Sequence, residues 1–265
     1  MGEVLTVLAV GLATAAVVMT VTAAIARRLG RVAVVDVAWG LGFVAIAVTT
    51  ALVGDTDAVR RWLVPVLVAT WGLRLAWHIR RRAVGAGEDP RYEELLGGPV
   101  DEVGFGVAVR KVFVVQGAAM WFISLPVQVG AARPVLWWPV LVVGCALWLV
   151  GVVFEATGDA QLASYKKDPD RGPVMDRGLW GWTRHPNYFG DACVWWGLWL
   201  VGGLASGWVP GLLTVLAPVA MTYFLVFATG ARLLERTMMQ RPGYPKYADH
   251  TSMFFPLPPR RRSGG

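Results

Sequence analysis

The sequence has little charge, few cysteines and few histidines, and each shortage excludes a class of protein. Only 16% of the 265 residues are charged and 55% are hydrophobic, which leaves too little polar surface to cover a water-soluble core of this size. Both cysteines, Cys145 and Cys193, lie in apolar runs, so a disulfide framework and a cysteine-rich metal site are excluded. The three histidines lack the spacing of a metal site. We predict no metal.

Long apolar stretches, in contrast, occur throughout the chain. A helix needs about 20 apolar residues to cross the hydrocarbon core, and such stretches lie at 4–26, 32–54, 62–79, 112–132 and 134–154. Residues 192–231 carry no charge, and a single helix of that length would measure about 60 Å, twice the bilayer. The glycine-rich segment 202–211 therefore predicts a turn. We expect an all-α polytopic integral membrane protein with seven transmembrane helices, forming one domain over residues 1–257.

The orientation follows from the basic residues. If seven spans alternate, the segments on one side of the membrane, with Arg74 beside them, hold 22 of the 25 Lys and Arg residues, and the other side keeps Arg60, Arg61 and Arg133. The positive-inside rule makes the basic side cytoplasmic, so we expect the N-terminus outside and the C-terminus in the cytoplasm of a bacterial inner membrane. Because the basic residues flank apolar spans, the net charge of +7 does not indicate a nucleic-acid partner. Residues 258–265 form a basic tail, expected to be disordered and to meet anionic lipid.

Two ionisable residues fall within the expected spans, where a charge is costly and usually has a function. Asp36 stands in the second span beside Trp39, and Arg74 stands in the third. Either they pair with each other, or they line a polar cavity that opens to the cytoplasmic side. The loop around Glu88–Tyr92 follows the third span and is positioned to cover such a cavity.

A second polar block precedes the sixth span. It reads Arg184-His185-Pro186-Asn187-Tyr188, and proline suits the first turn of a helix. A helix N-terminus flanked by Arg and His binds phosphate or carboxylate well, although a basic loop that binds lipid headgroups would have the same composition. The sequence contains no P-loop motif. The stretch Gly40-Leu41-Gly42 is not a dinucleotide fingerprint, because it lies inside a span.

These blocks resemble a known family. The runs Gly178-Leu179-Trp180 and Arg184–Asp191, with Asp159 upstream and Arg232 downstream, resemble the C-terminal signature of the steroid 5-alpha-reductase and sterol-reductase superfamily. The earlier segments Asp36–Gly40 and Glu88–Tyr92, with Trp71 and Arg74, are similar to its uncharacterised bacterial branch. The resemblance covers residues 32–257.

The resemblance implies an NADPH-dependent reductase of a carbon–carbon double bond in a lipid: steroid-like, isoprenoid or unsaturated fatty acyl. Within such a reductase, we expect Asp36 and Tyr92 to be the catalytic residues and Trp39, Trp71 and Arg74 to bind the substrate. The cofactor-binding residues that the resemblance implies are Asp159, Lys166, Arg184, His185, Asn187, Tyr188, Asp191, Arg232, Arg236 and Tyr247. Glu155 and Trp71 replace an amide and a tyrosine of the steroid reductases, so a 3-keto steroid is not implied. A redox partner stays open.

Two alternatives remain. Membrane methyltransferases that modify isoprenylcysteine or phospholipid amines with S-adenosylmethionine share the Arg-His-Pro-x-Tyr core, and Glu235 and the Tyr244–Tyr247 stretch fit that class. A non-enzymatic lipid-binding membrane protein would also explain the expected topology, but it gives no reason for Asn187 and Asp191 beside the Arg-His pair.

Overall fold

The computed structural model describes residues 2–228 and 230–258, and within these ranges it is helical and contains no β-strand. The expected tail at 258–265 lies, apart from Pro258, outside the described residues. The chain divides into two compact units. One comprises the residues up to Leu141 together with Trp199–Ala217, and the other comprises Val142–Leu198 and the residues from Pro218 onward.

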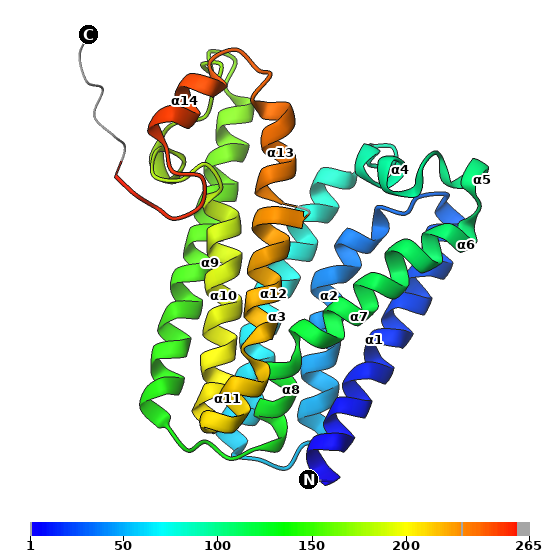
Figure 1. The fold of residues 1–265 in the computed structure, drawn as a ribbon, viewed down its shortest axis with the longest axis vertical. Helices are drawn as coiled ribbons and strands as arrows, with labels where there is room; N and C mark the ends of the chain where they lie inside the picture. The colour runs from blue at the N-terminus through cyan, green and yellow to red at the C-terminus, as the bar shows by residue number, and fades with distance from the viewer. Residues whose placement is uncertain (1, 229, 259–265) are drawn as a thin grey trace. The chain divides into compact units, whose positions relative to one another are not determined.

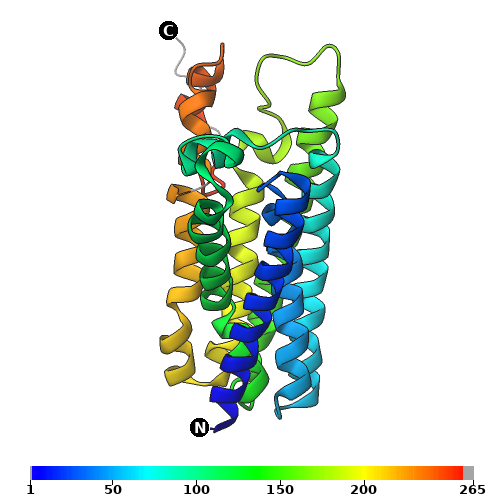
Figure 2. The same cartoon turned by 90° about the vertical axis from the view of Figure 1, so that its right-hand side faces the viewer.

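Three long helices form the main part of the first unit. They are α1 (Gly2–Leu29), α2 (Val34–Val53) and α3 (Ala58–Ala83), and both views show them side by side (Figures 1 and 2). Helix α1 ends with Arg27 and Arg28 in its last turn, where cations offset the helix dipole, and Gly30 turns the chain with a φ of +64°. Helices α2 and α3 approach closely, because a Cβ added to Gly72 would lie 2.7 Å from the Gly40 carbonyl oxygen.

The rest of the first unit is more broken. Short helices α4 (Pro90–Leu96), α5 (Val100–Val103) and α6 (Phe105–Ala108) lead through a wide π-helical segment, Val109–Val114, into α7 (Val115–Ile123) and α8 (Leu125–Ala132). Pro126 stands at the start of α8 and cannot donate a backbone hydrogen bond, which explains the break at Ser124. After the predicted turn, where Gly207 has a φ of +112°, α11 (Trp208–Thr214) begins.

In the second unit, two helices pack backbone against backbone. They are α9 (Trp138–Lys167) and α10 (Pro186–Gly202), which lie side by side in Figure 1. Helix α9 carries glycines at intervals of seven, at 144, 151 and 158. A Cβ on Gly151 would lie 2.5 Å from the carbonyl oxygen of Gly190, and one on Gly197 would lie 2.7 Å from that of Gly144. Small residues permit this approach, which is common between membrane helices.

The unit is completed by α12 (Leu216–Tyr223), a π-helical segment at Phe224–Ala228, α13 (Ala231–Met238) and α14 (Tyr244–His250). Trp196 of α10 donates its indole N–H to the Thr222 hydroxyl of α12, 3.1 Å away, which satisfies a polar group in an apolar setting.

Six helical segments of the described chain are long and apolar enough to cross a membrane. They are Gly2–Leu29, Val34–Val53, Ala58–Ala83, Phe105–Ile123, Trp138–Lys167 and Trp208–Met238. The chain is therefore an all-helical integral membrane protein. The expected sixth span corresponds to α10, which has 17 residues, or about 25 Å of helix at 1.5 Å per residue. Trp62, Trp138 and Trp208 stand near helix ends and are exposed, as in an interfacial aromatic belt.

We expect Gly151→Leu to destabilise the protein by about 3 kcal/mol, because the new side chain would meet backbone atoms that cannot move aside. Val150 is the neighbouring residue and is exposed, so Val150→Leu is the matched control and should change little. Thermal unfolding of both variants in detergent measures the difference. Equal stability of the two variants would contradict the close packing of α9 and α10.

Candidate functional site

In the first unit, a short helix holds the loop after α3 against the start of α2. Helix α4 is defined by its ends: the Asp89 carboxylate accepts a hydrogen bond from the backbone N–H of Arg91, Pro90 occupies the first turn, and Gly97 ends the helix with a φ of +94°. The Lys111 ammonium donates to the backbone carbonyl of Leu95, 2.9 Å away. Both ends of α4 are thus fixed by polar contacts.

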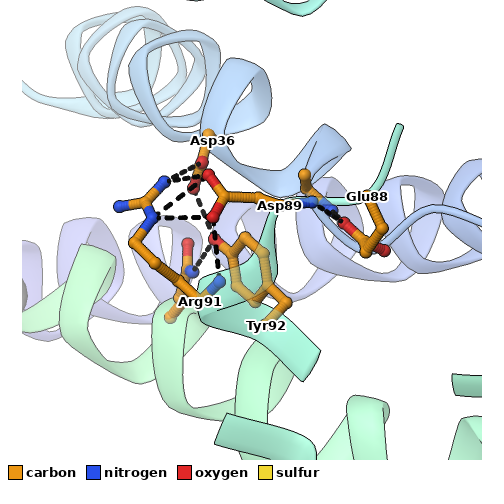
Figure 3. Close-up of polar contacts among 7 residues, drawn as sticks. Asp36, Glu88, Asp89, Arg91 and Tyr92 are labelled. Atoms are coloured by element: carbon orange, nitrogen blue, oxygen red, sulfur yellow. Dashed lines mark hydrogen bonds and ion pairs between the residues drawn. The ribbon is translucent and has the colours of Figure 1, made fainter. Parts of the chain in front are cut away.

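Asp36 lies at the centre of the cluster that this helix forms (Figure 3). Its carboxylate accepts hydrogen bonds from the Tyr92 hydroxyl and, at 3.1 Å, from the Arg91 guanidinium. Arg91 also pairs with Asp89 at 2.7 Å. On the other side of the phenol, the Gln116 amide of α7 donates to the Tyr92 oxygen at 3.4 Å. Asp36 therefore pairs with α4.

Glu88 fastens the same segment to α2. Its carboxylate accepts hydrogen bonds from the backbone N–H groups of Val32 and, at 2.9 Å, of Ala33. These groups immediately precede α2, where backbone donors lack a partner within the helix and the dipole favours a negative charge. Glu88 thus satisfies backbone donors at the start of α2, while its neighbours Asp89 and Pro90 begin α4.

The surroundings set the protonation of this cluster. Hydrogen bonds from the Arg91 side chain hold the pKa of the Asp89 carboxyl below its usual range. Burial, assisted by the neighbouring Asp36 carboxylate, raises the pKa of the Tyr92 phenol. Tyr92 is only 7% exposed, and it keeps its proton at neutral pH, available as a hydrogen-bond donor.

In the second unit, the C-terminal segment folds back over the loop that precedes α10. The Tyr247 hydroxyl donates to the carbonyl of Trp180 at 2.6 Å, and the Thr183 hydroxyl donates to the carbonyl of Phe254 at 2.9 Å. The backbone N–H of Arg184 donates to Ser252 at 2.9 Å. Residues 180–184 are therefore held by hydrogen bonds to a segment some 70 residues later in the chain.

Glu235 of α13 organises the Arg-His pair. Its carboxylate lies 2.7 Å from Nε and 3.0 Å from Nη2 of Arg184, and its Oε1 lies 3.1 Å from Nε2 of His185. The His185 ring stacks on Tyr188, with ring centroids 5.5 Å apart. The side chains of Arg184 and Glu235 are 11% and 13% exposed, so this is a largely buried, two-point ion pair.

The Tyr244 hydroxyl completes this cluster, 3.5 Å from the Glu235 carboxylate. Burial, followed by the negative charge of Glu235, raises the pKa of Tyr244 to about 12. The phenol is therefore a neutral donor toward Glu235 at physiological pH.

Two further predicted residues meet between α9 and α10. The Asn187 amide donates to the Asp159 carboxylate at 3.4 Å, and the Asn187 carbonyl oxygen accepts from the backbone N–H of Tyr188. Asp159 and Asp191 are both buried, as is Glu155. The glycine contacts between the two helices bring these acidic side chains and the amide into one region of the unit.

Other predicted residues have different surroundings. Arg232 lies over the Phe227 ring, 4.4 Å from its centroid, and is exposed, as are Arg236 and Lys166. In the first unit, Trp39 contacts Phe43 edge-on, and Phe43 contacts Trp71 in the same way. Trp71 is fully buried, so a substrate reaches its ring only if neighbouring side chains move. Arg74 follows on α3 and is half-buried.

The second unit also contains a large cavity. It has a volume of about 730 Å³ and lies between the segment after α9 and helix α14. Tyr247 is the one residue of the expected cofactor set that lines it. Its volume falls within the range of about 300–1,000 Å³ found for small-molecule and cofactor sites.

A family model described as "Protein of unknown function (DUF1295)" matches residues 22–251. The chain belongs to this family. The match includes the Asp36–Tyr92 cluster, the Arg184–Glu235 cluster and the Asp159–Asn187 pair. Comparison with curated proteins and with solved structures gives no match. The DUF1295 assignment therefore identifies relatives of this chain without assigning its residues a role.

Sequence reasoning missed the contributions of Glu88 and Gln116, and it did not foresee that Glu235 binds both Arg184 and His185. The sequence around Glu88 did indicate such a role, since Asp89-Pro90 beside it starts a helix and an acidic residue at that place can cap a neighbouring helix. The sequence contains no signal for the contact of Gln116 or for the pairing of Glu235, because their partners are 24 and 51 residues away.

Replacing Glu235 by Ala should cost about 3 kcal/mol of stability, because it leaves the guanidinium of Arg184 buried without its partner. The double variant Arg184→Met/Glu235→Ala should be more stable than the sum of the two single losses implies. Unfolding of the three variants and the wild type gives this coupling. Strictly additive losses would mean that the ion pair contributes nothing.

Proposed function

We propose that this DUF1295 protein is an NADPH-dependent membrane reductase of a carbon–carbon double bond in a lipid: steroid-like, isoprenoid or unsaturated fatty acyl. The family match supports this, since DUF1295 is associated with steroid 5-alpha-reductase-like proteins. The observation that carries the proposal is the contact of Asn187 with Asp159 at the start of α10. These two residues are 28 positions apart, and the family resemblance implies both as cofactor ligands.

The proposal includes a topology. Helix α10 would be the sixth of seven spans, with the N-terminus outside and the C-terminus in the cytoplasm of a bacterial inner membrane. The charge pattern supports this orientation, because one side of such an arrangement holds 22 of the 25 basic residues when Arg74 is counted with it. The Arg184–Glu235 cluster and the loop after α9 would then face the cytoplasm, where NADPH is available.

The residues of the second unit fit such a cofactor in chemistry. NADPH, when bound, would supply a hydride to one carbon of the double bond. Asn187 carries both donors and acceptors, and Asp159 is an acceptor, which suits ribose hydroxyls or a carboxamide. Exposed Lys166 and Arg236 would bind phosphate oxygens. Arg184 is already paired with Glu235, so its role would be to fix the position of His185 and the start of α10.

The Asp36–Tyr92 pair would act on the polar part of the substrate. Tyr92 holds its proton firmly and directs it toward Asp36, and Arg91 balances the charge of that carboxylate. Reduction of a double bond requires a proton on the carbon next to the one that accepts the hydride. Tyr92 and Asp36 are the groups that we propose for holding and directing this proton.

A second function is supported by one specific contact. Glu235 binds the Arg-His part of the Arg-His-Pro-x-Tyr core directly, and a glutamate beside that core also fits the membrane methyltransferases that use S-adenosylmethionine. A lipid-binding protein without catalytic activity is the third reading. It is less favoured because it leaves the Asn187–Asp159 contact without a purpose.

Ligand-dependent thermal stability separates these functions. We expect the purified protein to unfold at a higher temperature with NADPH, and to gain much less from NADH, which lacks the 2′-phosphate. The methyltransferase function instead predicts stabilisation by S-adenosylmethionine. A protein that responds to neither NADPH nor S-adenosylmethionine would leave the lipid-binding function.

Substitutions at Asn187 and at the Asp36–Tyr92 pair should affect different steps, cofactor binding in the first case and turnover in the second. Asn187→Ala should weaken NADPH binding at least tenfold, which corresponds to about 1.4 kcal/mol, while the protein stays folded. Tyr92→Phe and Asp36→Asn should leave NADPH binding unchanged and reduce turnover of an identified lipid by about 10²-fold or more, the usual contribution of a general acid or base. Full turnover in both variants would remove this pair from the reaction.

A further inference from the structure

The large cavity of the second unit carries a combination of side chains that is informative about a ligand. Its lining residues come from two segments, 165–181 and 243–251, although not every residue of these segments lines it. These segments supply two guanidinium groups, an ammonium group, an imidazole, three carboxylates and two phenol rings: Arg171, Arg177, Lys246, His250, Asp168, Asp170, Asp176, Tyr165 and Tyr247.

Two of the cations are available to a ligand. Arg177 and Lys246 come from the two different segments that line the cavity, and they form no ion pair with any residue in the described ranges. Arg171, by comparison, is partly used. It donates to the backbone carbonyl of Lys166 at 2.7 Å and lies over the Tyr165 ring, 6.0 Å from its centroid. Arg177 and Lys246 are therefore the groups with the most capacity to bind phosphate.

The aromatic rings are held in place by their hydroxyl groups. Tyr247 donates to the carbonyl of Trp180 and Tyr165 donates to that of Gly172, so both rings line the cavity in fixed positions. Among the acids, Asp168 accepts from the backbone N–H of Asp170 at 2.9 Å and shapes the turn. Asp170 and Asp176 remain as acceptors for hydroxyl or amino groups.

Simple anions would not need this mixture. Inorganic phosphate requires cations alone, and three carboxylates would weaken its binding. A phosphorylated nucleoside uses all three kinds of group: cations for phosphate, carboxylates for a ribose hydroxyl or a base amino group, and rings for stacking on the base. The cavity volume of about 730 Å³ accommodates a ligand of that size.

We infer that this cavity receives the phosphorylated adenosine end of the dinucleotide, and that Arg177 and Lys246 bind its 2′-phosphate. This rests on the proposed reductase function and deepens it. Neither residue belongs to the cofactor set that the family resemblance implies, whereas Arg184 of that set is committed to Glu235. Arg177 and Lys246 would then determine the preference for NADPH over NADH.

Binding measurements on the purified full chain test the inference without an activity assay. The ligands are NADPH, NADH and adenosine 2′,5′-bisphosphate, titrated calorimetrically. Arg177→Gln and Lys246→Gln should each weaken NADPH and the bisphosphate about tenfold, or roughly 1.4 kcal/mol, and leave the affinity for NADH within a factor of about two. Lys167→Gln is the matched control, because Lys167 is exposed and does not line the cavity.

The outcomes separate the two proposals. If the wild type binds NADPH and both variants bind it equally well, the cavity assignment is wrong and the reductase function stands. If the wild type binds S-adenosylmethionine and not NADPH, the reductase function fails. Dependence of adenosine bisphosphate binding on Arg177 and Lys246 would support the cavity assignment. Unfolding temperatures without ligand show that the variants are folded.

Discussion

The close approach of α9 and α10 is the constraint on which the second unit depends. Side chains larger than hydrogen at 151 or 190 would push the two backbones apart, and membrane helices have no hydrophobic driving force to compensate for poor packing. The same contact sets the position of Asp159 against Asn187 and, through Pro186, the direction in which the Arg-His pair leaves the helix. Packing of the smallest residues thus determines the geometry of the most polar ones.

Charge is handled in the same way in both units. Each places a carboxylate against an arginine where apolar helices meet polar loops: Asp36 with Arg91 in one, and Glu235 with Arg184 in the other. In both cases a tyrosine hydroxyl contacts the same carboxylate. Pairing compensates for the cost of desolvating each charge, and the tyrosines add neutral donors that keep the carboxylates satisfied.

Much of the fold was predictable because membrane helices leave strong local signals. Apolar length located the spans, glycine and proline located the turn before α11, and Pro186 correctly marked the start of α10. The seven-span count and the orientation stay predictions, since six segments meet the criteria of length and composition. Asp36 and Tyr92 were both selected from sequence, and the structure brings them together.

The remaining contacts could not be predicted because they join residues far apart in sequence. Nothing around Arg184 indicates that Glu235 binds it, and nothing near Trp180 indicates that Tyr247 fixes its backbone. The cavity lined by Arg177 and Lys246 likewise needs two segments about 70 residues apart. Spacing rules describe one helix or one loop, whereas these sites depend on how loops fold over helices.

The return of residues 244–257 over the loop at 180–184 has a consequence for biosynthesis. The ribosome makes this segment after every membrane helix described above, so the loop lacks its hydrogen-bond partners while those helices enter the bilayer. The contacts of Trp180 and Thr183 with Tyr247 and Phe254 can form only once synthesis has passed that point. Until then the newly inserted chain has its membrane helices without the hydrogen bonds that hold this loop.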